Sequence, residues 1–162
     1  DINSAGIEEV ALLAKDDPVD VRFIELMPLG CGKGYDGVES DELLCRLEER
    51  FGRAESLRSE TGVGPACYYR FAGFQGRIGF ISPLSHQFCH ACNRVRLTSD
   101  GFLKLCLQYP DGVDLKTPLR GGCTDDELAD LIGEAIRRKP AAHAFRDAAG
   151  LCEERKMVQI GG

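Results

Sequence analysis

Three cysteines in the second half of the chain have a spacing that could bind a metal. Cys89 and Cys92 are separated by two residues, and Cys106 follows fourteen positions after Cys92. A Cys-x2-Cys turn lets two sulfur atoms approach one metal ion, or one edge of a cluster, without backbone strain. A turn at Asp100–Gly101 would make the strand-like run 102–107 return toward this turn. The sequence therefore predicts that the three thiolates converge.

The spacing of these cysteines leaves four interpretations open. They could be packed core residues, although Cys-x2-Cys is uncommon by chance. Cys89 and Cys92 could form a disulfide, but only in an oxidising compartment. A structural zinc ion would need a fourth ligand, for which the candidates are His86, His90 and Cys123. An iron–sulfur cubane on three cysteines would leave one iron open, and an open iron can bind a substrate.

Two arginines follow the cysteine pair with the spacing of one strand face. Arg94 and Arg96 are two positions apart, so their side chains would point to the same side of a strand. Residues 83–109 also contain Lys104, against Asp100 as the acidic residue. Paired guanidinium groups beside a metal site are suited to binding a phosphate or a nucleotide. The alternative is that they form ion pairs with Asp100 or with the acidic helices.

The composition is that of a globular protein and argues against a membrane-spanning protein and against a general nucleic-acid-binding protein. Of 162 residues, 43% are apolar and 28% are charged, and no apolar run approaches the ~20 residues of a membrane helix. The net charge of −6 is concentrated in residues 1–60, which hold 15 acidic and 7 basic side chains. This balance argues against general nucleic-acid binding and allows a local anion site later in the chain. The eight irregularly spaced cysteines favour a reducing, cytoplasmic environment over a disulfide framework.

The elements that must position these residues alternate between helical and extended patterns. Helical periodicity and a capping box predict helices over residues 4–15, 40–51 and 124–139. Asn3 or Ser4 is the expected cap of the first helix. Apolar or alternating runs predict strands over residues 19–27, 66–71, 78–80, 94–98 and 102–107. One helix and one buried strand cannot complete a parallel sheet, which favours a larger barrel or sheet upstream. We therefore expect an α+β fold: the last helix–strand unit of an incomplete (β/α) barrel, then antiparallel strands and helices that carry the cysteine loop.

The segment 83–101 contains the run Cys-His-Ala-Cys-Asn-Arg-Val-Arg at 89–96. It resembles the C-terminal cluster signature of the molybdenum-cofactor GTP 3′,8-cyclases, the MoaA family. The segments 21–30, 114–120 and 157–162 resemble the same family, so the resemblance covers essentially the whole chain in order. It implies three parts: residues 1–30 as the end of a radical-SAM barrel, 31–150 as the C-terminal iron–sulfur and GTP-binding domain, and 151–162 as a tail ending in Gly-Gly.

The resemblance implies a substrate site in the second half of the chain. The residues concerned are the cluster ligands Cys89, Cys92 and Cys106, the GTP contacts Arg94, Val95 and Arg96, and the catalytic tail residues Gly161 and Gly162. By resemblance, the cysteines would hold a 4Fe–4S cluster whose fourth iron binds the guanine of GTP. The two glycines would enter the active site, where a backbone without side chains can approach a ligand closely.

The resemblance also implies a radical reaction that needs more than this chain. Arg22 and Met27, at the end of a barrel strand, would lie at the site of S-adenosylmethionine (SAM). A second 4Fe–4S cluster would cleave SAM, and the resulting radical would abstract hydrogen from the ribose of GTP before the sugar carbon attacks guanine C8. The Cys-x3-Cys-x2-Cys motif of that cluster is absent from the sequence. We therefore expect the N-terminal barrel to be a required partner, the full protein to be a homodimeric lyase, and this chain alone to be inactive.

Two other classes of function stay open. One is a zinc-stabilised binding module without catalysis, and the other is the auxiliary-cluster domain of a radical-SAM enzyme that modifies peptides. The acidic balance and the arginine pair favour a nucleotide over nucleic acid or peptide as the ligand. No role is predicted for the remaining cysteines, which are Cys31, Cys45, Cys67, Cys123 and Cys152.

Overall fold

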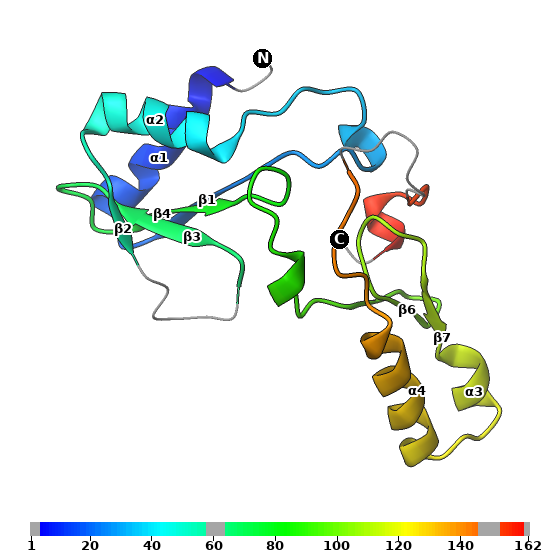
Figure 1. The fold of residues 1–162 in the computed structure, drawn as a ribbon. Coiled ribbons are helices and arrows are strands. Elements are labelled where there is room, and N and C mark those ends of the chain that lie inside the picture. Colours follow the sequence, from blue (N-terminus) through cyan, green and yellow to red (C-terminus); the bar gives the residue numbers. More distant parts are fainter. Residues whose placement is uncertain (1–3, 58–63, 146–152, 161–162) are drawn as a thin grey trace. The chain divides into compact units, whose positions relative to one another are not determined.

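The chain forms two compact units, each with its own sheet. The structure is a computed structural model that describes residues 4–57, 64–145 and 153–160. The first unit is built from the stretches 1–26 and 36–87, and the second from 27–35 and 88–162. Both contain helices and mostly antiparallel strands (Figure 1), so the predicted α+β class is confirmed at this level.

The first unit is a sheet with two helices packed against it. Its elements are α1 (Ile7–Asp16), β1 (Asp20–Ile24), α2 (Ser40–Phe51), β2 (Glu55–Leu57), β3 (Cys67–Arg70) and β4 (Arg77–Ile81). The strand order is β1-β4-β3-β2, in which β1 and β4 are parallel and the other pairs are antiparallel. Figure 1 shows α1 and α2 lying over this sheet.

The core of the first unit explains why these helices form where the periodicity predicts them. Ala11 and Ala14 of α1 and Leu47 of α2 are completely buried, and they pack in one cluster with Phe71 and Ile78 from the sheet side. The alanines let α1 approach closely, while the larger side chains fill the space beneath α2. A buried leucine or phenylalanine contributes about 1.5–3 kcal/mol, so this cluster holds the unit together.

Strand β1 differs from its prediction in length and burial. It spans Asp20–Ile24 rather than 19–27, and Ile24 is 60% exposed. The prediction of a buried strand is wrong because β1 is the edge strand of its sheet, with β4 as its neighbour among the described residues. Since β1 shares a sheet with β2 to β4, residue 30 does not separate the compact units. The assignment of residues 1–30 to a barrel stays a prediction.

Helix α1 also starts differently from its prediction. A 3-10 turn at Ser4–Gly6 precedes it, and Gly6 occupies the N-cap position without a side-chain hydrogen bond. The predicted cap at Ser4 is therefore wrong, because Ser4 lies inside a turn that runs directly into the helix. Asn3 lies outside the described residues.

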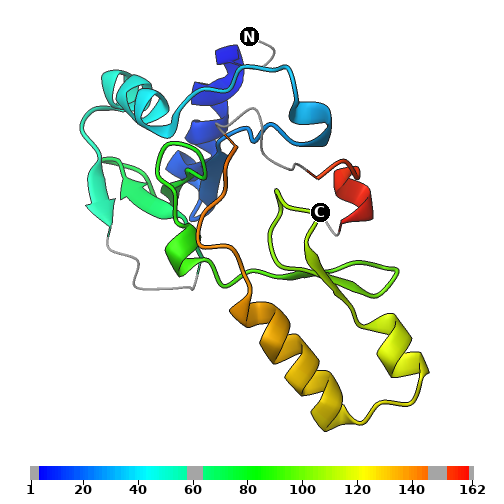
Figure 2. The same cartoon turned by 45° about the vertical axis from the view of Figure 1, so that its right-hand side comes forward.

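The second unit combines a small sheet with two helices. Its elements are a 3-10 turn η3 (Cys89–Ala91), β5 (Arg96–Leu97), β6 (Phe102–Lys104), β7 (Gly112–Asp114), α3 (Lys116–Arg120) and α4 (Asp125–Arg137). The three strands pair antiparallel in the order β5-β6-β7, which confirms the predicted hairpin. Figure 2 shows α3 and α4 lying alongside each other beyond this sheet. None of the helices in the described part of the chain has the length and apolar character needed to cross a membrane.

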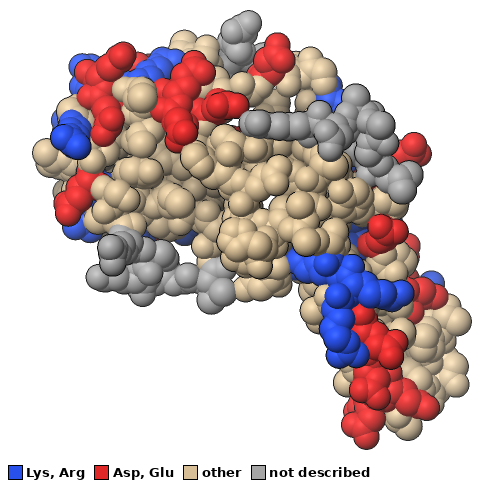
Figure 3. Space-filling model, viewed as in Figure 1, with Lys and Arg blue, Asp and Glu red and all other residues tan. Residues whose placement is uncertain are grey.

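Helix α4 begins at the capping box that the sequence predicts. The Thr124 hydroxyl accepts the backbone N–H of Glu127 at 3.3 Å, and the Glu127 carboxylate accepts the Thr124 N–H at 2.8 Å. The helix carries acidic side chains in its first turn and a basic one, Arg137, in its last, which suits the helix dipole. In Figure 3, Lys and Arg gather over the end of α4 that leads to residues 138 and 139, and acidic side chains cover the other end.

Candidate functional site

Cys89 and Cys92 occupy a single 3-10 turn. The backbone N–H of Cys92 donates to the carbonyl oxygen of Cys89 at 3.1 Å, and that of Ala91 donates to the carbonyl of Phe88 at 3.0 Å. Both cysteines are half-buried and neither forms a disulfide. One short piece of backbone therefore presents two thiols, as the Cys-x2-Cys spacing predicts.

Cys106 lies just past β6, on the opposite arm of the β5–β6 hairpin. The hairpin pairs Arg96 with Lys104 and Leu97 with Leu103. The same register continued by two residues places Arg94 opposite Cys106, with Cys92 two positions further along. The observed strand pairing ends at Arg96 and Lys104, so the approach of Cys106 to the Cys89–Cys92 turn stays a prediction.

A lysine holds these two arms together at that end. The ammonium group of Lys139 donates to the carbonyl oxygen of Arg94 at 2.8 Å and to that of Leu105 at 2.5 Å. Because both oxygens contact one nitrogen, the backbone next to Cys92 lies close to the peptide that joins Leu105 to Cys106. The two arms are thus neighbours beyond the last strand pair, in agreement with the predicted hairpin return.

The described residues do not contain a preformed metal-binding group. Within residues 4–57, 64–145 and 153–160, no group of three or more His, Cys, Asp or Glu side chains could hold a metal ion. The zinc candidate His86 instead lies 3.0 Å from a carboxylate oxygen of Asp41. A cubane binds each cysteine through a different iron, so its sulfur atoms need not converge on one metal. Cys89, Cys92 and Cys106 are free thiols, but they do not form a metal-binding group among the described residues, and their convergence stays a prediction.

The side chains of the two arginines that follow the cysteine turn have no partner among the described residues. Arg94 is exposed and Arg96 is half-buried, and neither side chain forms a hydrogen bond or ion pair with any residue that the structure describes. Asp100 is the expected alternative partner of these arginines. Its carboxylate instead accepts a hydrogen bond from the Thr98 hydroxyl, and this hydrogen bond lowers the pKa of Asp100. An anion could therefore reach both guanidinium groups without displacing a carboxylate.

Lys104 is not available to bind an anion. The prediction that groups Lys104 with Arg94 and Arg96 as a basic residue near the site is therefore wrong. Its side chain is fully buried and forms an ion pair with Glu153, whose side chain is 4% exposed. Lys104 also donates to the carbonyl oxygen of Tyr109 at 2.8 Å. Burial raises the pKa of Glu153, but hydrogen bonds from Arg155 and Lys104 outweigh it and lower the pKa to about 2. No local pattern marks this pair, because its partners are 49 positions apart.

The predicted tail residues Gly161 and Gly162 lie outside the described residues. The segment before them, 153–160, is attached to the second unit through the Lys104–Glu153 pair. The backbone N–H of Glu153 also donates to the carbonyl of Gln108 at 2.6 Å, and Ile160 is 1% exposed.

Arg22, a predicted SAM contact, keeps an accessible side chain. It lies in β1, is 53% exposed and is 3.9 Å from Asp20. Arg77 takes the stronger position on this carboxylate, with two hydrogen bonds of 2.8 and 2.6 Å that lower the pKa of Asp20. Arg22 also lies over the ring of Tyr68. Met27 belongs to the second unit, so a joint SAM site of Arg22 and Met27 stays a prediction.

Glu25 is a buried carboxylate that no local sequence pattern marks. It is 5% exposed and accepts backbone N–H groups from Ser40 at 3.1 Å, Leu84 at 2.8 Å and Ser85 at 3.0 Å, together with the Ser85 hydroxyl. Burial raises its pKa, but the hydrogen bonds from Ser85, Leu84 and Ser40 outweigh burial and lower the pKa to about 2. Glu25 therefore ties the end of β1 to the start of α2 and to the segment that leads toward the cysteine turn.

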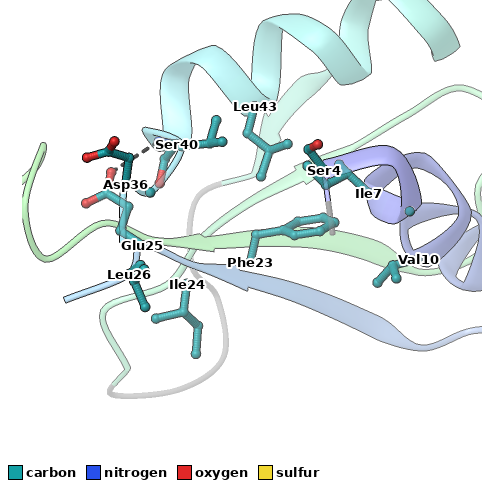
Figure 4. Close-up of a pocket in the computed structure, with 13 residues that line it drawn as sticks. Ser4, Ile7, Val10, Phe23, Ile24, Glu25, Leu26, Asp36, Ser40 and Leu43 are labelled. Atoms are coloured by element: carbon teal, nitrogen blue, oxygen red, sulfur yellow. Dashed lines mark hydrogen bonds between the residues drawn. The ribbon is translucent and has the colours of Figure 1, made fainter. Parts of the chain in front are cut away.

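The first unit also contains a cavity of about 470 Å³. Figure 4 shows Glu25, Asp36 and Ser40 gathered at one end of it, with Phe23 and Ile7 toward the other. None of its lining residues is basic. A nucleotide triphosphate needs cationic partners, so the cavity is not a suitable GTP site.

Comparisons with known proteins identify relatives along the whole chain. The family described as Molybdenum Cofactor Synthesis C matches residues 19–145. Relatives named GTP 3′,8-cyclase are 44% identical over 164 residues in Desulforamulus reducens, 40% over 162 in Clostridium perfringens and 42% over 168 in Gloeobacter violaceus. These alignments cover 99 to 100% of this chain but 50 to 51% of each relative. The chain thus spans about half the length of the curated relatives it matches, namely their C-terminal half.

Proposed function

This chain belongs to the Molybdenum Cofactor Synthesis C family, and from that premise we propose that it is the GTP-binding, cluster-carrying half of a GTP 3′,8-cyclase. The observation that carries the proposal is the end of the β5–β6 hairpin. There, Lys139 joins the backbone at Arg94 to the backbone at Leu105, and the side chains of Arg94 and Arg96 have no partner among the described residues. The names of the relatives support GTP as the substrate.

Each residue at the hairpin end has a role in this proposal. Cys89, Cys92 and Cys106 supply thiolates to a 4Fe–4S cluster, which, when bound, offers one iron without a protein ligand to the guanine of GTP. Arg94 and Arg96 orient the triphosphate through charge-assisted hydrogen bonds. Successive side chains of a strand point to opposite faces, so the side chain of Val95 points away from the face of Arg94 and Arg96. Val95 therefore contacts the nucleotide through its backbone.

The remaining assignments concern the complete enzyme. Arg22 uses its exposed guanidinium group, together with Met27, to bind SAM, whose carboxylate suits an arginine. Gly161 and Gly162 enter the active site and act on cyclisation rather than on folding. The Cys-x3-Cys-x2-Cys motif for the cluster that cleaves SAM is not in this sequence, so an N-terminal barrel supplies it and the chain alone is inactive. The full enzyme is a homodimeric lyase.

The test is anaerobic reconstitution of the chain with iron and sulfide. We expect about four iron and four sulfide per chain, and a loss of both when Cys89, Cys92 or Cys106 is replaced by Ser. Cys45→Ser and Cys67→Ser are matched controls, because both cysteines are exposed and lie in the first unit. Stoichiometric zinc without sulfide in the purified chain would contradict the proposal and favour the zinc-stabilised module.

A further inference from the structure

Lys139 makes an unusual pair of contacts for a surface lysine. It follows α4 directly, and its ammonium group donates to two backbone carbonyl oxygens rather than to a carboxylate. It forms no ion pair with any residue in the described part of the chain. The side chain is half-buried, so its positive charge is held in place and not neutralised by the protein.

The two carbonyl groups flank the predicted cluster ligands. One belongs to Arg94, two residues after Cys92, and the other forms the peptide bond to Cys106. The strand pairing of β5 and β6 ends at Arg96 and Lys104. Beyond that pair, Lys139 provides the hydrogen bonds that join the two cysteine arms among the residues that the structure describes.

Helix α4 is a suitable support for this contact. Its start is fixed by the capping box at Thr124, and it packs against β7 of the same sheet as the hairpin. The backbone N–H of Lys139 donates to the carbonyl of Ile136 at 3.1 Å, and Pro140 follows immediately, which restricts the backbone on both sides. The basic end of α4 in Figure 3 is thus joined to the hairpin by defined hydrogen bonds.

We propose that Lys139 is a positioning residue of the iron–sulfur site, which holds the arms of Cys92 and Cys106 at the spacing that a cluster needs. The inference rests on the proposed function. Residues around metal ligands commonly fix ligand geometry, and their loss typically weakens metal binding about 10- to 100-fold.

The test compares the wild-type chain with three variants, which are Lys139→Met, Lys139→Arg and Arg138→Met. Lys139→Met removes the charge and the donors but keeps the length of the side chain, whereas Lys139→Arg keeps both properties. Arg138→Met is the matched control, because Arg138 is exposed and its side chain has no partner among the described residues. If Lys139→Met fails to fold by circular dichroism, Lys139→Leu, which also lacks the charge and the donors, takes its place.

The first measurement uses the cluster-free chain, and the second the reconstituted one. Lys139→Met should speed amide hydrogen exchange in residues 92–97 and 103–106 about tenfold, because two hydrogen bonds between the arms are lost. It should also speed the loss of iron to a chelator about tenfold. Lys139→Arg should stay near the wild-type values, and Arg138→Met should match them.

The outcomes separate this inference from the proposed function. A wild-type chain that takes up no cluster would contradict the proposed function, and iron analysis reveals this before any variant is compared. A wild-type chain that binds the cluster, with Lys139→Met equal to Arg138→Met in exchange and iron loss, would overturn the role of Lys139 alone.

Discussion

The charged side chains of this chain divide into those that have a protein partner and those that do not. Glu25 is buried under four hydrogen bonds, and Lys104 is buried against Glu153. Arg94 and Arg96 form no such contacts among the described residues. A paired and buried group stabilises the fold, whereas a guanidinium group without a partner among the described residues can bind an anionic ligand. The sequence showed the two arginines but could not show that Lys104 is buried, because its partner is distant in the chain.

The unpaired arginines lead to a prediction about affinity. Replacing Arg94 or Arg96 by Ala should weaken GTP binding to the reconstituted chain by about 1–3 kcal/mol, because a charge-assisted hydrogen bond is lost. The iron content should not change. Titration calorimetry measures the affinity, with Arg53→Ala as the control, since Arg53 is exposed and lies in the first unit. Unchanged affinity in both variants would rule out their contact with GTP.

Glu25 leads to a prediction about stability and pH. Its pKa falls from 4.5 to about 2 in the folded chain, so the stability that it contributes is present above pH 4.5 and disappears as the pH falls toward 2. Glu25→Gln should therefore lower the free energy of unfolding at neutral pH by about 3 kcal/mol.

Urea unfolding of both proteins across this pH range measures the difference. It should shrink steadily as the wild-type carboxylate becomes protonated. Glu49→Gln, on an exposed side chain without a partner among the described residues, should match the wild type throughout. A difference between wild type and Glu25→Gln that stays constant with pH would show that the charge of Glu25 does not stabilise the fold.

At the scale of elements, the sequence predicted well those features that depend on a few neighbouring residues. It did not predict features that depend on pairing between distant segments. The β5–β6 hairpin and the start of α4 follow from a turn at residues 99–101 and from a capping box at 124–127, which are contained in a few residues. The sequence did not predict β2, β7 and α3, which are three to five residues long. The burial of β1 was wrong because a run of apolar residues does not reveal whether a strand lies at a sheet edge.

The hairpin turn allows a matched pair of substitutions. Gly101 and Gly122 both have positive φ, at 86° and 85°, so alanine at either should cost about 1–2 kcal/mol. A Cβ at Gly101 would lie 2.7 Å from Cβ of Lys116, whereas nothing lies within 4 Å at Gly122. Gly101→Ala should therefore destabilise the chain more than Gly122→Ala and should retain less iron after reconstitution. Thermal unfolding and iron analysis measure both effects, and equal values would show that the hairpin tolerates the added carbon.

At the scale of the whole chain, an ion pair between distant residues attaches the C-terminal segment to the second unit. The ion pair of Lys104 and Glu153 attaches the segment 153–160 to β6, near the arm of Cys106. The sequence predicted a tail that leads to Gly161 and Gly162, but not its attachment, because the pairing of two charges 49 positions apart depends on the finished fold. The comparisons add that this chain corresponds to about half of its relatives.

This ion pair can be tested by a double-mutant cycle. Glu153→Met should cost about 3–5 kcal/mol of stability, because Lys104 would remain buried without a carboxylate. The double variant Lys104→Met with Glu153→Met should be more stable than Glu153→Met alone, since no fully buried charge is then left without a partner. Urea unfolding measures four proteins: the wild type, Lys104→Met, Glu153→Met and the double variant. Strictly additive effects of the two substitutions would contradict a direct coupling between the side chains.

The most direct measurement of the proposed function is Mössbauer spectroscopy of the chain reconstituted with enriched iron, with and without GTP. If Cys89, Cys92 and Cys106 hold a cluster with one open iron, about one iron in four should change its isomer shift when GTP binds. The other irons, each held by a thiolate, should keep theirs. A four-iron spectrum that saturating GTP leaves unchanged would contradict binding of the nucleotide at the cluster.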